Sequence, residues 1–220
     1  MKKYLSSLSC LLLPFLFLVL SSLNSCNEEK PKKTEEGDID KLIALFKNDT
    51  SLEKGGFTKV LQALKDGTWN IDDAFDTKTG AKREKYYKWD KRAKPGDWRT
   101  FVINVAEGGV DGDHIPYFEY AKKKGAKFDE IGKYGRNILH LIVNPVGEIG
   151  EATVNELKWL FENLDDEVIK NIINVKKKNE NRGTDTQNQP LDCVRSSKYE
   201  AQIIDLLKSK GAKSGKKTTT

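Results

Sequence analysis

A short motif occurs three times between residues 100 and 194. Each copy opens on a polar residue and continues with the apolar residues of a helix, and the copies are Thr100–Gly109, Asn137–Val143 and Gln189–Val194. Such repetition constrains the fold more than composition does, because a repeated helix pair can cover its apolar face only with a neighbouring pair. The chain is therefore expected to form a stack of similar units.

A Gly-Ala-Lys sequence follows the first and the third copies of the motif. Gly125-Ala126-Lys127 and Gly211-Ala212-Lys213 each come after apolar residues at helical spacing. Glycine at such a position suits the left-handed backbone that often ends a helix. Farther upstream, 57–67 is predicted to be the second helix of a divergent N-terminal capping pair, with 39–46 as its first helix.

The motif resembles the T-P-L-H opening of the ankyrin repeat, and Gly-Ala resembles the end of that repeat's second helix. The resemblance implies an all-α fold over 39–213, a short irregular ankyrin-like solenoid of three to four helix-pair repeats with long loop insertions. It implies structural roles for Thr100, Asn137, Leu139, His140, Leu191, Gly125 and Gly211. The copies are longer than the family's period of about 33 residues: Leu139 follows Val102 by 37 positions and Leu191 follows Leu139 by 52. The excess is expected near 165–173 and 176–188.

The start of the chain predicts export and lipid attachment. Lys2 and Lys3 precede an uncharged run, Cys10–Leu20, which is about a dozen residues long and too short to span a bilayer. Leu23-Asn24-Ser25-Cys26 resembles the lipobox of bacterial lipoproteins. That resemblance implies removal of 1–25, a lipid on Cys26, and a place outside the cytoplasm in the bacterial cell envelope, at the outer membrane or cell surface. The alternative is ordinary cleavage that leaves Cys26 as a free thiol.

Two segments lack the apolar side chains that could repay the entropy of ordering. We expect 26–38 to be a flexible tether of roughly 20 Å and 214–220 to be a disordered tail. After processing, Cys193 would be the remaining cysteine, so an intramolecular disulfide is excluded. Charged residues make up 32% of the chain, yet the net charge is only +5, which argues against nucleic acid as a partner.

Catalysis and metal binding find little support in the sequence. His140 and His114 both stand where the ankyrin family commonly places histidine, which gives each a structural explanation. Asp111-Gly112-Asp113-His114 could bind a metal, but a polar turn with Asp113 as helix N-cap explains it better. Cys193 is interpreted as a small buried apolar residue. We expect no catalytic residue, no metal and no cofactor.

The insertion at 76–98 mixes basic and aromatic side chains. Arginine and large aromatic residues commonly anchor protein interfaces, and the candidate partner-binding residues are Lys85, Tyr86, Tyr87, Lys88, Trp89, Arg92 and Trp98. The sequence thus predicts a membrane-anchored, non-catalytic module that binds an unidentified protein. The alternatives are adhesion to an acidic polymer or membrane surface through 78–98, and, third, an enzyme of unknown class. Equally, the aromatic side chains could pack the insertion onto the helices.

Overall fold

Helices make up nearly all regular structure in the computed structural model, which describes residues 36–47, 54–77, 79–82, 98–110, 112–132, 135–145, 148–176 and 188–215. These residues belong to one unit, Glu36–Thr220. The helices are α2 (Glu36–Phe46), α3 (Lys54–Lys65), α4 (Phe101–Asn104), the π-helix η1 (Val105–Gly109), α5 (Ile115–Lys123), α6 (Ile138–Val143), α7 (Glu151–Asn163), α8 (Asp166–Ile173), the 3₁₀ turn η3 (Pro190–Cys193) and α9 (Glu200–Ser209). The predicted all-α class is confirmed at this level.

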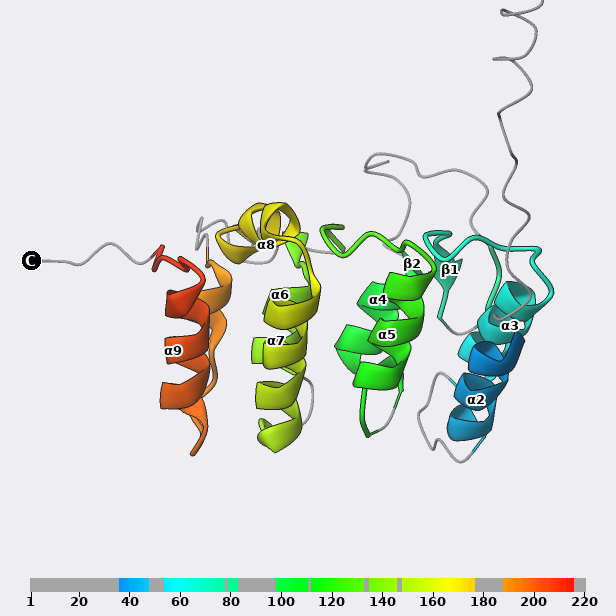
Figure 1. The fold of residues 1–220 in the computed structure, drawn as a ribbon, viewed down its shortest axis with the longest axis horizontal. Coiled ribbons are helices and arrows are strands. Elements are labelled where there is room, and N and C mark those ends of the chain that lie inside the picture. Colours follow the sequence, from blue (N-terminus) through cyan, green and yellow to red (C-terminus); the bar gives the residue numbers. More distant parts are fainter. Residues whose placement is uncertain are drawn as a thin grey trace, which may run out of the picture. The chain divides into compact units, whose positions relative to one another are not determined.

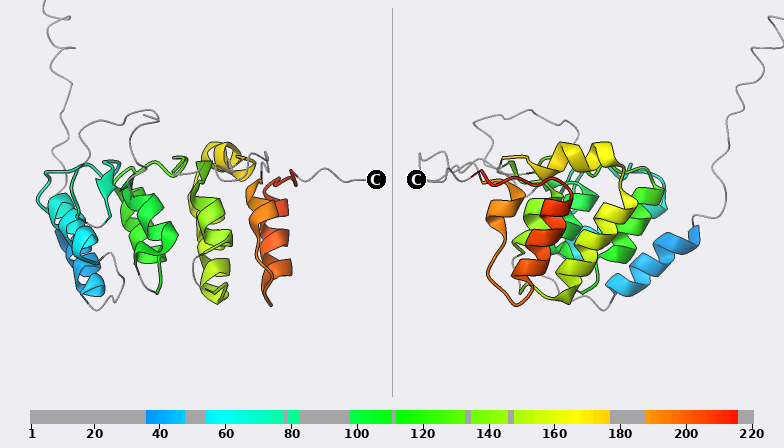
Figure 2. Two further views of the ribbon diagram at one scale, coloured as in Figure 1. Left: turned by 180° about the vertical axis from the view of Figure 1, so that it is seen from behind. Right: turned by 60° about the vertical axis from the view of Figure 1, so that its left-hand side comes forward.

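Apart from α8, which lies across one end of the stack, the helices of this unit stand in two rows (Figure 1). One row contains α5, α7 and α9, and the other contains α4 with η1, α6 and η3. Helix α4 pairs with α5, α6 with α7, and η3 with α9, so that each pair covers the apolar face of the next (Figure 2). Among the described residues no helix is both long enough and apolar enough to cross a membrane.

In the N-terminal pair, α2 and α3, the helix that comes first in the chain lies in the row of α5, α7 and α9. Helix α2 packs against α5, in the row of second helices. Helix α3 lies next to α4, where the Phe57 and Phe101 ring centroids are 5.4 Å apart. The helices predicted at 39–46 and 57–67 are therefore present as α2 and α3, with α2 in the row of α5 and α3 beside α4. Phe57 joins this pair to both rows, because its fully buried ring contacts Phe101 of α4 and Tyr117 of α5 as well as Phe46 and Phe75.

The three recurring motifs occupy equivalent structural positions. Thr100, Asn137 and Gln189 precede α4, α6 and η3 as N-caps, with extended backbones whose ψ angles are 170°, 179° and 165°. The third copy differs from the expected helix, because Pro190–Cys193 forms only one 3₁₀ turn. Leu191 is consequently half-buried, whereas its counterpart Leu139 is fully buried.

The glycine landmarks end helices in the same way. Gly125 has φ +73° and Gly211 has φ +88°, a left-handed conformation that costs glycine little. The amide N–H of the next residue returns to a carbonyl five positions back, from Ala126 to Ala121 (2.9 Å) and from Ala212 to Leu207 (3.1 Å). Gly67 ends α3 with the same geometry, and Thr68 donates to Ala63 (3.0 Å).

The long insertions leave the stack at one end of the helices. Strands β1 (Phe75–Asp76) and β2 (Trp98–Arg99) pair antiparallel and close the base of the first insertion. Helix α8 contributes part of the excess length predicted near 165–173, and the other part, 177–187, lies outside the described residues.

Ordered structure reaches into both segments that were expected to be flexible. Helix α2 begins at Glu36, inside the tether assigned to 26–38. At the other terminus, Ser214 Oγ and the Gly215 amide donate to Asp192 at 2.6 and 2.8 Å, so the tail assigned to 214–220 is held at its start. In both places polar contacts with distant residues hold a segment that has few apolar side chains of its own: Asp38 pairs with Lys123, and Ser214 and Gly215 bind Asp192.

Candidate functional site

The sequence-predicted binding segment lies largely outside the described residues. Of its candidate residues, Lys85, Tyr86, Tyr87, Lys88, Trp89 and Arg92 are not described, and neither is the predicted lipidation site Cys26. Trp98 belongs to β2, where its backbone pairs with Asp76. The structure thus fixes where this segment leaves and rejoins the stack, at β1 and β2.

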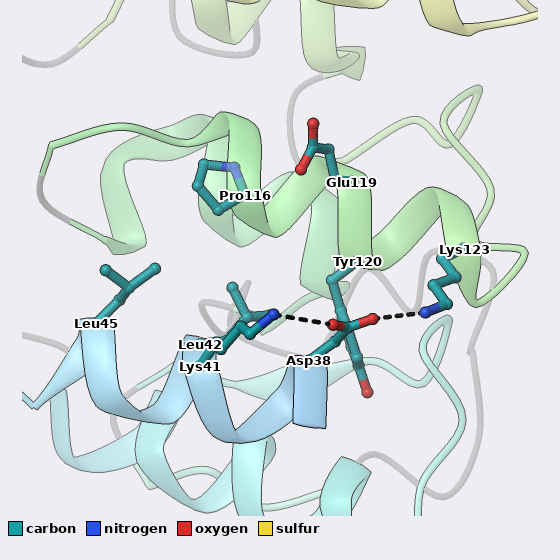
Figure 3. A pocket seen from close by; sticks show the side chains of 8 residues that line it. All are labelled: Asp38, Lys41, Leu42, Leu45, Pro116, Glu119, Tyr120 and Lys123. Atoms are coloured by element: carbon teal, nitrogen blue, oxygen red, sulfur yellow. Dashed lines mark hydrogen bonds and ion pairs between the residues drawn. The ribbon is translucent and has the colours of Figure 1, made fainter. Parts of the chain in front are cut away.

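A surface groove lies between α2 and α5, and we call it the α2/α5 groove (Figure 3). It has a volume of about 310 Å³, and Asp38, Lys41, Leu42, Leu45, Pro116, Glu119, Tyr120 and Lys123 line it. Leu45 is 54% exposed, which is unusual for so large an apolar residue in this unit. Beside it, Leu42 and Tyr120 are buried and form the floor.

Charged side chains close one end of the α2/α5 groove. Asp38 pairs with Lys123 of α5 at 2.5 Å and with Lys41 of its own helix at 3.7 Å. The hydrogen bond from Lys123, together with its positive charge, lowers the pKa of Asp38 below its ordinary value. Glu119, on the α5 rim, is exposed (Figure 3). The groove therefore offers an apolar patch beside one available carboxylate.

His140 has a structural position at the start of α6. Its backbone N–H donates to Asn137 Oδ1 (3.2 Å), and its Nδ1 accepts from the Asn137 backbone N–H (3.3 Å), which together form a capping box. The Nε2 atom lies 3.2 Å from the Asn188 carbonyl oxygen. Asn137 also donates from Nδ2 to the Ile172 carbonyl (2.6 Å). This cap thereby ties α6 to the two segments that flank 177–187.

His114 forms a contact that sequence reasoning missed. It is the N-cap residue of α5, the position predicted for Asp113. Asp113 instead accepts from the Ile115 amide in the preceding turn (2.9 Å). The His114 Nδ1 atom lies 3.0 Å from Glu156 Oε1 of α7. No local pattern signals this pair, because its members are 42 positions apart.

The remaining expected site residues fall into structural positions. Thr100 is buried at the start of α4 and makes no side-chain cap hydrogen bond. Cys193 is buried, as predicted. Across the described part of the chain, histidine, cysteine and acidic side chains form no group of three that could hold a metal ion, and Asp111 lies outside that part.

Comparison with known proteins identifies no relative. No protein-family model matches the chain, and no curated protein or solved structure is significantly similar to it.

Proposed function

We propose that this protein is a lipid-anchored, non-catalytic module of the ankyrin-repeat type that binds another protein outside the cytoplasm. Three features support the repeat assignment. The N-caps of three consecutive pairs are equivalent, α5 and α9 end in the same glycine geometry, and the helices stack in two rows. The lipobox-like Cys26 supports the anchor.

The observation that carries the binding proposal is the α2/α5 groove. An exposed leucine beside a buried leucine and tyrosine leaves apolar surface in water, which a partner side chain would remove at a gain of about 25 cal/mol per Å². Asp38 is already paired with two lysines, while Glu119 faces solvent. The groove thus favours a protein segment that carries a large apolar side chain close to a lysine or arginine.

The position of the groove fits an anchored protein. Cys26 precedes the start of α2 by only ten positions, and an extended chain covers no more than about 3.6 Å per residue. The lipid would therefore hold α2 within about 36 Å of the membrane surface. A partner in or near the same membrane would meet the groove at high effective concentration.

Photo-crosslinking from the groove tests this function. A photoreactive amino acid at Leu45 in the full-length, membrane-bound protein should crosslink to one defined protein, whereas the same group at Glu162, exposed on α7, should not. Leu45→Asp and Glu119→Lys should each weaken binding of the purified partner by about tenfold or more. The first would bury a charge under the partner's apolar side chain, and the second would repel the partner's lysine or arginine. The exposed-surface variant Glu162→Lys should bind normally.

Two outcomes would contradict this proposal. Crosslinking that is equal from Leu45 and Glu162 would mean that the groove is not the binding surface. Binding that survives Leu45→Asp but falls steeply between low and physiological salt would favour the acidic-polymer alternative through 78–98, since contacts with a polyanion depend strongly on salt.

A further inference from the structure

Helices α5 and α7 meet along one stripe of three side-chain pairs. His114, Phe118 and Lys122 follow each other at intervals of four on α5 and face Glu156, Trp159 and Asn163 of α7. The central rings are 5.8 Å apart between centroids, and Lys122 Nζ lies 3.4 Å from Asn163 Oδ1 at an exposed edge. The His114–Glu156 pair thus forms one end of the contact between the second and third helix pairs.

Both ring nitrogens of His114 face oxygen atoms. Nε2 lies 3.2 Å from the Val110 carbonyl oxygen, which can only accept, so Nε2 carries a proton. Nδ1 lies 3.0 Å from Glu156 Oε1, a distance at which the two side chains form an ion pair when the ring is protonated. The side chains are 15% and 8% exposed. Deprotonation of the ring would remove the positive charge that faces this buried carboxylate.

We propose that the His114–Glu156 pair is a pH-dependent clamp. At low pH it holds the α4–α5 turn to α7, and as the pH rises and the ring loses its charge it releases this end of the interface. The charged groups that face His114 are Glu156 from α7 and Asp113 from its own turn, both acidic. Because both groups are acidic, neither supplies a positive charge when the ring is deprotonated.

The sign of the pH dependence follows from the direction of the pKa shift. Burial opposes the charged ring, but the hydrogen bond and charge of Glu156, the Val110 carbonyl and the charge of Asp113 outweigh it and raise the pKa of His114 above 6.5. Folding therefore favours the protonated ring. The stabilisation is fully present below pH 6.5 and is lost as the pH rises through the folded-state pKa.

Urea unfolding of the full-length protein between pH 5.5 and 9 tests the clamp. The wild-type midpoint should stay level at low pH and fall as the pH rises above 6.5. In Glu156→Gln the side-chain amide can donate to Nδ1 of a neutral ring while Nε2 still donates to the Val110 carbonyl. The contact between the two side chains then does not require a protonated ring. The midpoint of this variant should lose the alkaline fall.

Asp38→Asn is the matched control. It removes a carboxylate from another ion pair, and because the pKa of Asp38 is lowered below 3.8, its loss should leave the alkaline fall unchanged. Amide exchange in the first two turns of α7, measured at pH 8.5, should be faster in the wild type than in Glu156→Gln. The comparison at a single pH cancels the intrinsic pH dependence of exchange.

Two results would overturn the clamp. One is an NMR titration in which the His114 ring has a pKa of 6.5 or lower. The other is a Glu156→Gln protein that keeps the wild-type alkaline fall. Neither measurement requires a His114 substitution, so the test does not depend on whether such a variant folds.

Discussion

The two histidines of the described unit both stabilise helix starts, but with different partners. His140 closes a capping box with Asn137 and reaches the Asn188 carbonyl, so it joins an element to the chain beyond it. His114 faces a carboxylate on a neighbouring pair. At the residue scale the polar groups of this protein therefore serve to fix where one helix pair meets the next.

His140→Gln should lower the free energy of unfolding by about 1–3 kcal/mol, the cost of leaving buried hydrogen-bond partners unsatisfied. Urea denaturation measures it, with Lys158→Gln on the exposed surface of α7 as a control that should change stability by less than about 0.5 kcal/mol. A double-mutant cycle with Asn137→Ala should give a coupling of at least about 0.5 kcal/mol. A fully stable His140→Gln protein that had lost partner binding would contradict the structural role and support a catalytic or binding one.

At the scale of elements, η3 is shorter and less buried than α6, the segment that precedes it in the same row. Helix α6 has all six residues buried, whereas η3 is a four-residue 3₁₀ turn that buries only Pro190 and Cys193. Pro190 lacks an N–H and fixes its own φ, which suits the first position of a helical turn. The Asp192 carboxylate accepts hydrogen bonds from the Gln189 amide, Ser214 Oγ and the Gly215 amide, and these bonds hold the short element in place.

Leu139→Ala and Leu191→Ala should differ in cost because of this difference. Leu139 is fully buried among packed helices, so its truncation should cost about 2–5 kcal/mol. Leu191 is half-buried at the last pair and should cost about 1–2 kcal/mol. Thermal or urea melts of the two variants provide the comparison. Equal losses would mean that η3 packs as tightly as α6, contrary to its exposure.

For the whole molecule, α2 comes directly after the expected tether in the chain and packs against α5. Helix α2 contributes Asp38 to the ion pair with α5 and Leu45 to the α2/α5 groove. The proposed anchor at Cys26 is thus only ten positions before the helix that contributes to the groove. Binding and membrane attachment are consequently expected to be separable, because they use different residues.

Cys26→Ala should move the protein from the membrane to the soluble fraction while its circular dichroism and urea midpoint stay unchanged, since the helices of Glu36–Thr220 do not need the lipid. Fatty-acid labelling followed by fractionation measures lipid attachment and membrane retention. Cys193→Ala is the matched control, because that buried cysteine should be dispensable for membrane retention. Labelling that persists in Cys26→Ala would refute the lipoprotein proposal.

Sequence alone determined the features that rest on residues close together in the chain. The helix starts after Thr100, Asn137 and Gln189 and the glycines at 125 and 211 were recognisable because the start or the end of a helix depends on the conformation and hydrogen bonds of residues within about five positions. Helices α2, α3 and α8 were predictable for a similar reason, since their apolar residues follow a helical period.

Only the tertiary structure decided the features that rest on distant residues. The placement of α2 beside α5 and of α3 beside α4 depends on contacts between distant residues, and the α2/α5 groove combines side chains that are more than 70 positions apart. The His114–Glu156 contact exists because α5 and α7 lie side by side. Burial turns an ordinary histidine and glutamate into a coupled pair, and burial is a property of the assembled stack rather than of either segment.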